Sequence, residues 1–86
     1  MARIEIQETA LAEGTAGGEM YFRLGMMYAT GRTVDQDLVT AHKWFNISAA
    51  RGYGEAARYR SELAAEMSGA EVAAAQRAAR EWLQLN

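Results

Sequence analysis

Residues 24–52 restrict the possible folds more than any other part of the chain, because they hold most of one amphipathic segment, a polar connection and a second amphipathic segment. In the first segment, residues 19–30, apolar side chains recur at the spacing of one helix face. They are Met20, Leu24, Met27 and Tyr28. Gly31 follows at once, in the position where helices often end in a left-handed glycine. The pattern predicts a helix whose Met20–Tyr28 face turns inward. Gly25 beside this face predicts a close approach of a neighbouring helix.

The second segment, residues 38–51, predicts the other half of a helical hairpin. Asp37 is a good N-cap because its carboxylate can accept from the free N–H groups of the first turn. Gly52 ends the helix. The predicted inward face consists of Leu38, Ala41, Trp44, Phe45, Ser48 and Ala49. His42, Lys43 and Asn46 fall on the predicted outer side, and Val34 in the connection is expected to fill the gap between the helices.

Two further helices are predicted in the C-terminal half, over residues 54–67 and 70–85. Ser68 and Glu71 have the spacing of a capping box, which is a strong signal for a helix start. Trp82 is expected to anchor the end of the last helix. Residues 1–17 are interpreted as an N-terminal segment or capping helix. Ile4, Ile6, Ala10 and Leu11 suit a short helix, whereas the alternation of Ile4 and Ile6 also suits an extended segment.

Composition narrows the class of protein. Eighty-six residues make one small domain, and the absence of Pro favours helices. No Cys is present, so neither disulfides nor thiolate chemistry is available. The mixed charges, with a net value of −2, give no basic surface for nucleic acid. The start of the chain lacks the apolar core of a signal peptide, and no run is long enough to span a membrane. We therefore expect a cytoplasmic, all-α protein without cofactor, metal, membrane or nucleic-acid partner.

Two short motifs recur at a spacing typical of helical repeats. Gly18-Glu19 returns as Gly54-Glu55 after 36 residues, and Ala41-x-x-Trp44 returns as Ala79-x-x-Trp82 after 38. The second copy is degenerate and has a shorter inter-helix loop. The expected architecture is a short right-handed α/α solenoid of about four helices in antiparallel hairpins. Residues 18–52 form the full unit, and residues 53–86 form the degenerate unit with a C-terminal capping helix.

The full unit resembles the Sel-one-like repeat, a subclass of the tetratricopeptide-like helical repeats. The positions that match the repeat are Leu24, Gly25, Tyr28, Gly31, Val34, Asp37, Ala41, Trp44, Ala49, Ala50 and Gly52. Met20 departs from the pattern, because the family usually has a small Ala there. The whole chain is also similar to a small single-repeat bacterial protein type that ends in an Ala-rich helix, here with Ala-Gln-Arg at 75–77 and Ala-Arg-Glu-Trp at 79–82.

The resemblance implies a non-catalytic scaffold for protein–protein contacts. A structural homo-oligomer, in which uncapped solenoid ends pair, is the alternative; an enzyme is the remote one. The candidate partner-binding surface is apolar and aromatic with an Arg at its rim, a composition that interfaces favour. It consists of Tyr21, Phe22, Met26, Met27 and Arg58. The N-terminal residues Ile4, Ile6 and Leu11 could instead cover this surface.

Other polar residues give weaker signals. His42 is the only His and has no second ligand nearby in sequence, so a solvated helix residue is expected rather than a metal ligand. Ser48 and His42 point to different sides of their helix, which excludes a catalytic pair. Four arginines of the last two helices, Arg58, Arg60, Arg77 and Arg80, predict a solvated face with salt bridges. A groove for an acidic peptide is the alternative interpretation, ahead of RNA binding.

Overall fold

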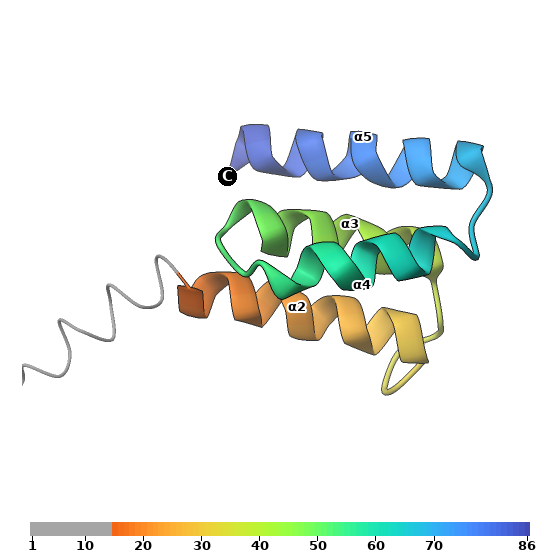
Figure 1. Cartoon of the computed structure of the whole chain (residues 1–86), viewed down its shortest axis with the longest axis horizontal. Helices are drawn as coiled ribbons and strands as arrows, with labels where there is room; N and C mark the ends of the chain where they lie inside the picture. Colours follow the sequence, from red (N-terminus) through yellow and green to blue (C-terminus); the bar gives the residue numbers. More distant parts are fainter. Residues whose placement is uncertain (1–14) are drawn as a thin grey trace, which may run out of the picture.

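The computed structural model describes residues 15–86 (Figure 1). These residues form four helices and no strand: α2 (Thr15–Thr30), α3 (Leu38–Ala50), α4 (Glu55–Ala64) and α5 (Gly69–Leu85). The predicted all-α fold of helical hairpins is therefore confirmed. The predictions for residues 4–13 lie outside the described residues.

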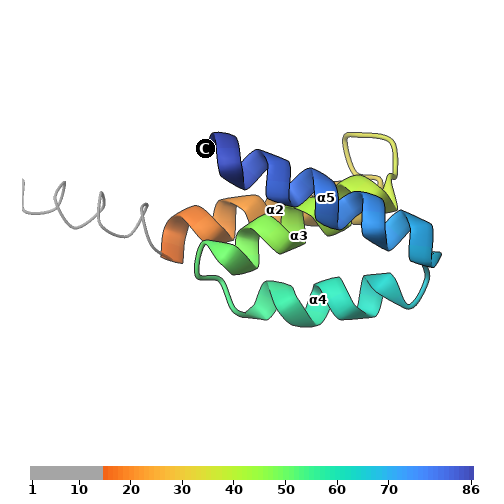
Figure 2. The same cartoon turned by 90° about the horizontal axis from the view of Figure 1, so that it is seen from above.

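Helix α3 is the centre of the fold, because α2, α4 and α5 all pack against it. Helices α2 and α4 run antiparallel to α3, and α5 runs parallel to it (Figure 1). Viewed from above, α4 and α5 lie on opposite sides of α3 (Figure 2). As a result α3 is buried around most of its circumference, with five buried side chains: Ala41, His42, Phe45, Ile47 and Ser48.

The predicted helix caps are confirmed. The Asp37 carboxylate accepts from the Thr40 backbone N–H at 3.1 Å and from the Thr40 hydroxyl at 2.8 Å. The same bonds lower the Asp37 pKa, because they stabilise the ionised carboxylate. At the start of α5, Ser68 and Glu71 form the full capping box, with reciprocal bonds of 3.1 and 2.8 Å. These local signals fix where α3 and α5 begin.

Gly25 brings α2 and α3 into close contact, as predicted. A Cβ added at this position would lie 2.5 Å from Cε1 of Phe45. The Phe45 ring is only 1% exposed and packs with Ala41 and Ala56 in the central cluster, so it has little room to move. Farther along the same interface, the buried Ser48 hydroxyl donates to the Gly18 carbonyl at 2.6 Å. The two contacts hold α2 against α3 along most of its length.

The predicted orientation of the first helix is only partly correct, since Tyr28 packs against the central cluster as predicted but other side chains lie differently. Met20 was expected to face inward, but it is 54% exposed. Phe22 and Met26 were expected to face outward, but both pack against the central cluster. The reason is that Gly18 and Gly25, seven residues apart, form the strip that contacts α3. Apolar side chains lie on both sides of that strip, so apolar periodicity alone did not define the buried face.

Helix α4 ends at Ala64, three residues before the predicted end. The backbone N–H groups of Glu66 and Met67 bond to carbonyls three residues back, at 2.9 and 3.0 Å. Such i→i−3 bonds tighten the last turn. Ser68 then adopts an extended conformation as the cap of α5, which prevents α4 from continuing.

An aromatic cluster joins the first and last helices to the centre. Tyr21 of α2 stacks on Trp44 of α3, with ring centroids 5.7 Å apart. Trp82 of α5 meets both rings edge-on, at 5.2 and 5.6 Å. Edge-to-face pairs of this kind are favourable beyond the area that they bury. Trp82 thus anchors the end of α5, as predicted. Trp44, expected in the core with Phe45, is instead half-buried in this cluster.

Substituting Gly25 tests the close approach of α2 and α3. We expect Gly25→Ala to lower the free energy of unfolding by about 1–3 kcal/mol, because overpacking at Phe45 outweighs the higher helix propensity of Ala. Gly69→Ala is the matched control, since an added Cβ there has no atom within 4 Å. It should leave stability unchanged or raise it by up to about 1 kcal/mol. Urea unfolding followed by Trp fluorescence measures both; equal effects would contradict the packing role of Gly25.

Candidate functional site: a groove between α4 and α5

An open groove of about 590 Å³ separates α4 from α5, and α3 forms its floor. It arises because α4 and α5 each pack against α3 on opposite sides (Figure 2). Small residues line the groove where its floor, α3, meets the wall formed by α5. Ala49 and Ala50 of α3 and Ala79 of α5 line the groove, with Leu83 at one end. Short side chains leave this space unfilled.

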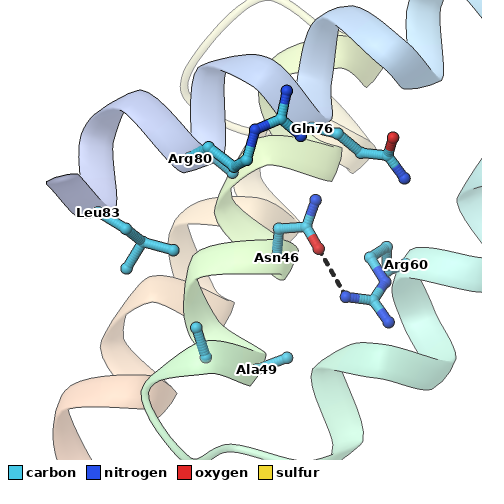
Figure 3. Close-up of a pocket in the computed structure, with 8 residues that line it drawn as sticks. Asn46, Ala49, Arg60, Gln76, Arg80 and Leu83 are labelled. Carbon is cyan, nitrogen blue, oxygen red and sulfur yellow. Dashed lines mark hydrogen bonds between the residues drawn. The ribbon is translucent and has the colours of Figure 1, made fainter.

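The polar lining of the groove is cationic. It consists of Arg60 of α4, Asn46 of α3, and Gln76 and Arg80 of α5, with no acidic side chain. Arg60 Nη1 donates to Asn46 Oδ1 at 2.5 Å, which holds the guanidinium above the floor (Figure 3). A guanidinium has five N–H donors, so Arg60 keeps others for a ligand. The groove can therefore accept a carboxylate beside a small apolar surface.

Neither arginine of the groove has an acidic partner within residues 15–86. The ion pairs found there join Arg23 to Glu19 at 3.7 Å and Arg58 to Glu62 at 3.8 Å. Arg58 also lies over the Tyr59 ring, 5.0 Å from its centroid. The arginines of the last two helices therefore do not all lie on one salt-bridged face. Arg58 fits the predicted salt-bridged face, whereas Arg60 and Arg80 form the cationic lining of a groove.

His42 is buried, contrary to the prediction of a solvated residue. It is 2% exposed, and its Nδ1 has no hydrogen-bond partner within the described part of the chain. Burial lowers the His42 pKa, and the positive charge of Arg60 lowers it further. The sequence prediction failed because it assumed one solvated face for α3. In the structure a third and a fourth helix cover that face as well.

The predicted partner-binding residues do not form one surface. Phe22 contacts Phe45, Tyr53 and Tyr59, with ring centroids 4.9–5.5 Å apart, and Tyr21 belongs to the aromatic cluster on the other side of the helix.

The remaining members of the predicted surface are also separated. Met26 packs against the central cluster, Met27 is half-buried, and Arg58 is exposed on α4. Cover by Ile4, Ile6 and Leu11 is therefore not required for Phe22 or Met26.

Sequence reasoning missed Asn46 and Gln76 as site residues. The available signal was the recurrence of small residues, since Ala49 lies on the predicted inward face of its helix and Ala79 belongs to the repeated Ala-x-x-Trp motif. Two parallel helices whose facing residues are alanines can pack closely or leave a groove. Which of these occurs here depends on the position of α4.

Residues 15–86 contain no cluster of three or more His, Cys, Asp or Glu side chains that could hold a metal ion. Among the helices of this region, none has the length and apolar character needed to cross a bilayer. Comparison of the chain with known protein families, curated proteins and solved structures finds no match.

The buried His42 makes stability depend on pH. Its pKa is lowered in the folded state from an ordinary value of 6.5, so the unfolded chain binds a proton at higher pH than the folded one. Stability is fully present above pH 6.5 and is lost as the pH falls through the folded pKa. Thermal unfolding between pH 8 and 5 should show this loss, and His42→Gln should flatten it. Asp37 titrates well below this range. An equally steep loss in the variant would contradict this assignment.

Proposed function

We infer that this chain is a non-catalytic interaction module of the Sel-one-like repeat type, and that the groove between α4 and α5 binds an acidic peptide segment. The observation that carries the proposal is the lining of the groove. Two arginines and two amides surround a small apolar floor, without any carboxylate among them. Arginine pairs well with carboxylates because its planar fork can donate two parallel hydrogen bonds.

The repeat assignment has local support. Gly25 lies at the close helix contact, Gly31 has a positive φ of 77°, and Asp37 caps the second helix. These are three of the positions that match the repeat. The non-catalytic assignment has support from His42, because a side chain that is 2% exposed cannot reach a substrate without opening the fold.

A structural homo-oligomer is the second candidate. Within residues 15–86 two large apolar side chains are strongly exposed: Met20 of α2 at 54% and Leu85 of α5 at 85%. Exposed apolar groups near the ends of a solenoid are available for pairing with another copy. Light scattering over a hundredfold range of protein concentration distinguishes the candidates. A stable dimer that Met20→Glu dissociates would favour the oligomer.

Peptide selection tests the binding function. We expect 12-residue peptides selected from a displayed random library against the full chain to be enriched in Asp or Glu beside apolar residues. Arg60→Gln with Arg80→Gln should then weaken binding at least about tenfold, since a charge-assisted hydrogen bond contributes about 1.5–3 kcal/mol.

The matched control for this selection is Arg58→Gln with Arg77→Gln. It removes the same charge from the same two helices, outside the groove, and should bind the selected peptides like the unmodified chain. Circular dichroism verifies the fold of each variant. Equal weakening of peptide binding by both double variants would refute the proposal.

A further inference from the structure

The net formal charge of the chain comes from residues that precede the described part. Residues 15–86 carry eight basic and eight acidic side chains, so the net charge of −2 comes entirely from residues 1–14. This segment has Glu5, Glu8 and Glu13 against a single Arg3. It also contains Ile4, Ile6 and Leu11. The segment therefore has the composition that the groove selects: carboxylates for Arg60 and Arg80, and apolar side chains for the alanine floor.

The start of α2 lies close to one end of the groove. The Gly18 carbonyl accepts from Ser48 of α3, and a Cβ on Gly18 would lie 2.9 Å from Cβ of Tyr53. Ala50, which lines the groove, lies between Ser48 and Tyr53 in the chain. The first turns of α2 thus lie beside the turn that ends α3, and the C-terminal part of α3 also lines the groove.

The length of the segment is sufficient. Fourteen extended residues reach up to about 46–50 Å, whereas the 13-residue helix α3 is about 20 Å long. The surface first predicted to receive this segment is also taken, since Phe22 and Met26 pack against the central cluster. The outer face of α2 offers less charge, because Arg23 there already pairs with Glu19.

We propose that residues 1–14 dock in the groove between α4 and α5 of the same chain, with their glutamates facing Arg60 and Arg80. The inference rests on the proposed function, because it treats the groove as a receptor for acidic segments. It adds a regulation: a partner peptide binds only by displacing the chain's own segment. A tethered segment competes at a high effective concentration, so the apparent affinity for a partner is reduced.

Paramagnetic relaxation enhancement tests the docking in the full chain. The protein has no Cys, so Ala2→Cys gives a single site for a nitroxide label. The protein that carries both ¹⁵N and the nitroxide is mixed with an excess of chain that carries neither, so that only broadening within one chain is observed. The backbone amide signals of Gln76, Arg80 and Leu83 should then lose most of their intensity. Arg60→Gln with Arg80→Gln should restore these signals, whereas Arg58→Gln with Arg77→Gln should leave them broadened. The spectra themselves verify that each variant is folded.

Three results would overturn the docking. The groove amides could keep full intensity, the broadening could fall on Arg23 and Met27 of α2, or it could appear only between a labelled copy and a separate ¹⁵N copy. The third result assigns the groove to the segment of a second chain.

Peptide binding separates this inference from the function on which it rests. Changing Glu5, Glu8 and Glu13 to Gln should raise the affinity for selected acidic peptides at least severalfold. Peptides that bind the groove without any broadening by the label would leave the function standing and refute the docking. If neither the unmodified chain nor this triple variant selects acidic peptides, the function itself fails.

Discussion

The close contact between Gly25 and Phe45 determines how all four helices pack. It sets α2 directly against α3, and the buried bond from Ser48 to the Gly18 carbonyl fixes the other end of the interface. With α2 held so closely, the large side chains beside the glycines extend around α3 rather than between the two helices. Phe22 reaches α4 through Tyr59, and Tyr21 reaches α5 through Trp82. One helix thereby supplies contacts to both later helices.

These two contacts explain why α4 and α5 lie on opposite sides of α3. Tyr59 of α4 packs against the rings of Phe22 and Phe45. On the other side of α3, Trp82 of α5 packs against the rings of Tyr21 and Trp44. Helices α4 and α5 therefore straddle α3. The surface of α3 left between them carries Asn46, Ala49 and Ala50, which are too small to fill the gap. The groove is thus a consequence of where the aromatic side chains lie.

Local features of this fold were predictable from the sequence, and features that depend on several helices were not. Asp37, Ser68 and Gly31 act within one turn of the chain, so their roles follow from neighbouring residues alone. The burial of His42 requires a knowledge of where α4 and α5 pass. The repeated Gly-Glu motif illustrates the same limit: Gly18 is pressed against Tyr53, but a side chain on Gly54 would meet no atom within 4 Å. The same two residues at this spacing have different roles, because Tyr53 and Ser48 lie against Gly18 and no atom lies near Gly54.

Arg60 connects the groove with the interior of the fold. Its guanidinium bonds to Asn46 in the groove, and its charge contributes to the lowered pKa of the buried His42. A carboxylate bound to Arg60 would offset part of that positive charge and so raise the His42 pKa. Binding and protonation are then linked with the same sign, and linkage is reciprocal: protonation of His42 must strengthen the binding of an acidic segment by the same factor. A mildly acidic solution would weaken the fold through His42 and would favour an occupied groove, so a carboxylate bound at Arg60 would offset part of the lost stability.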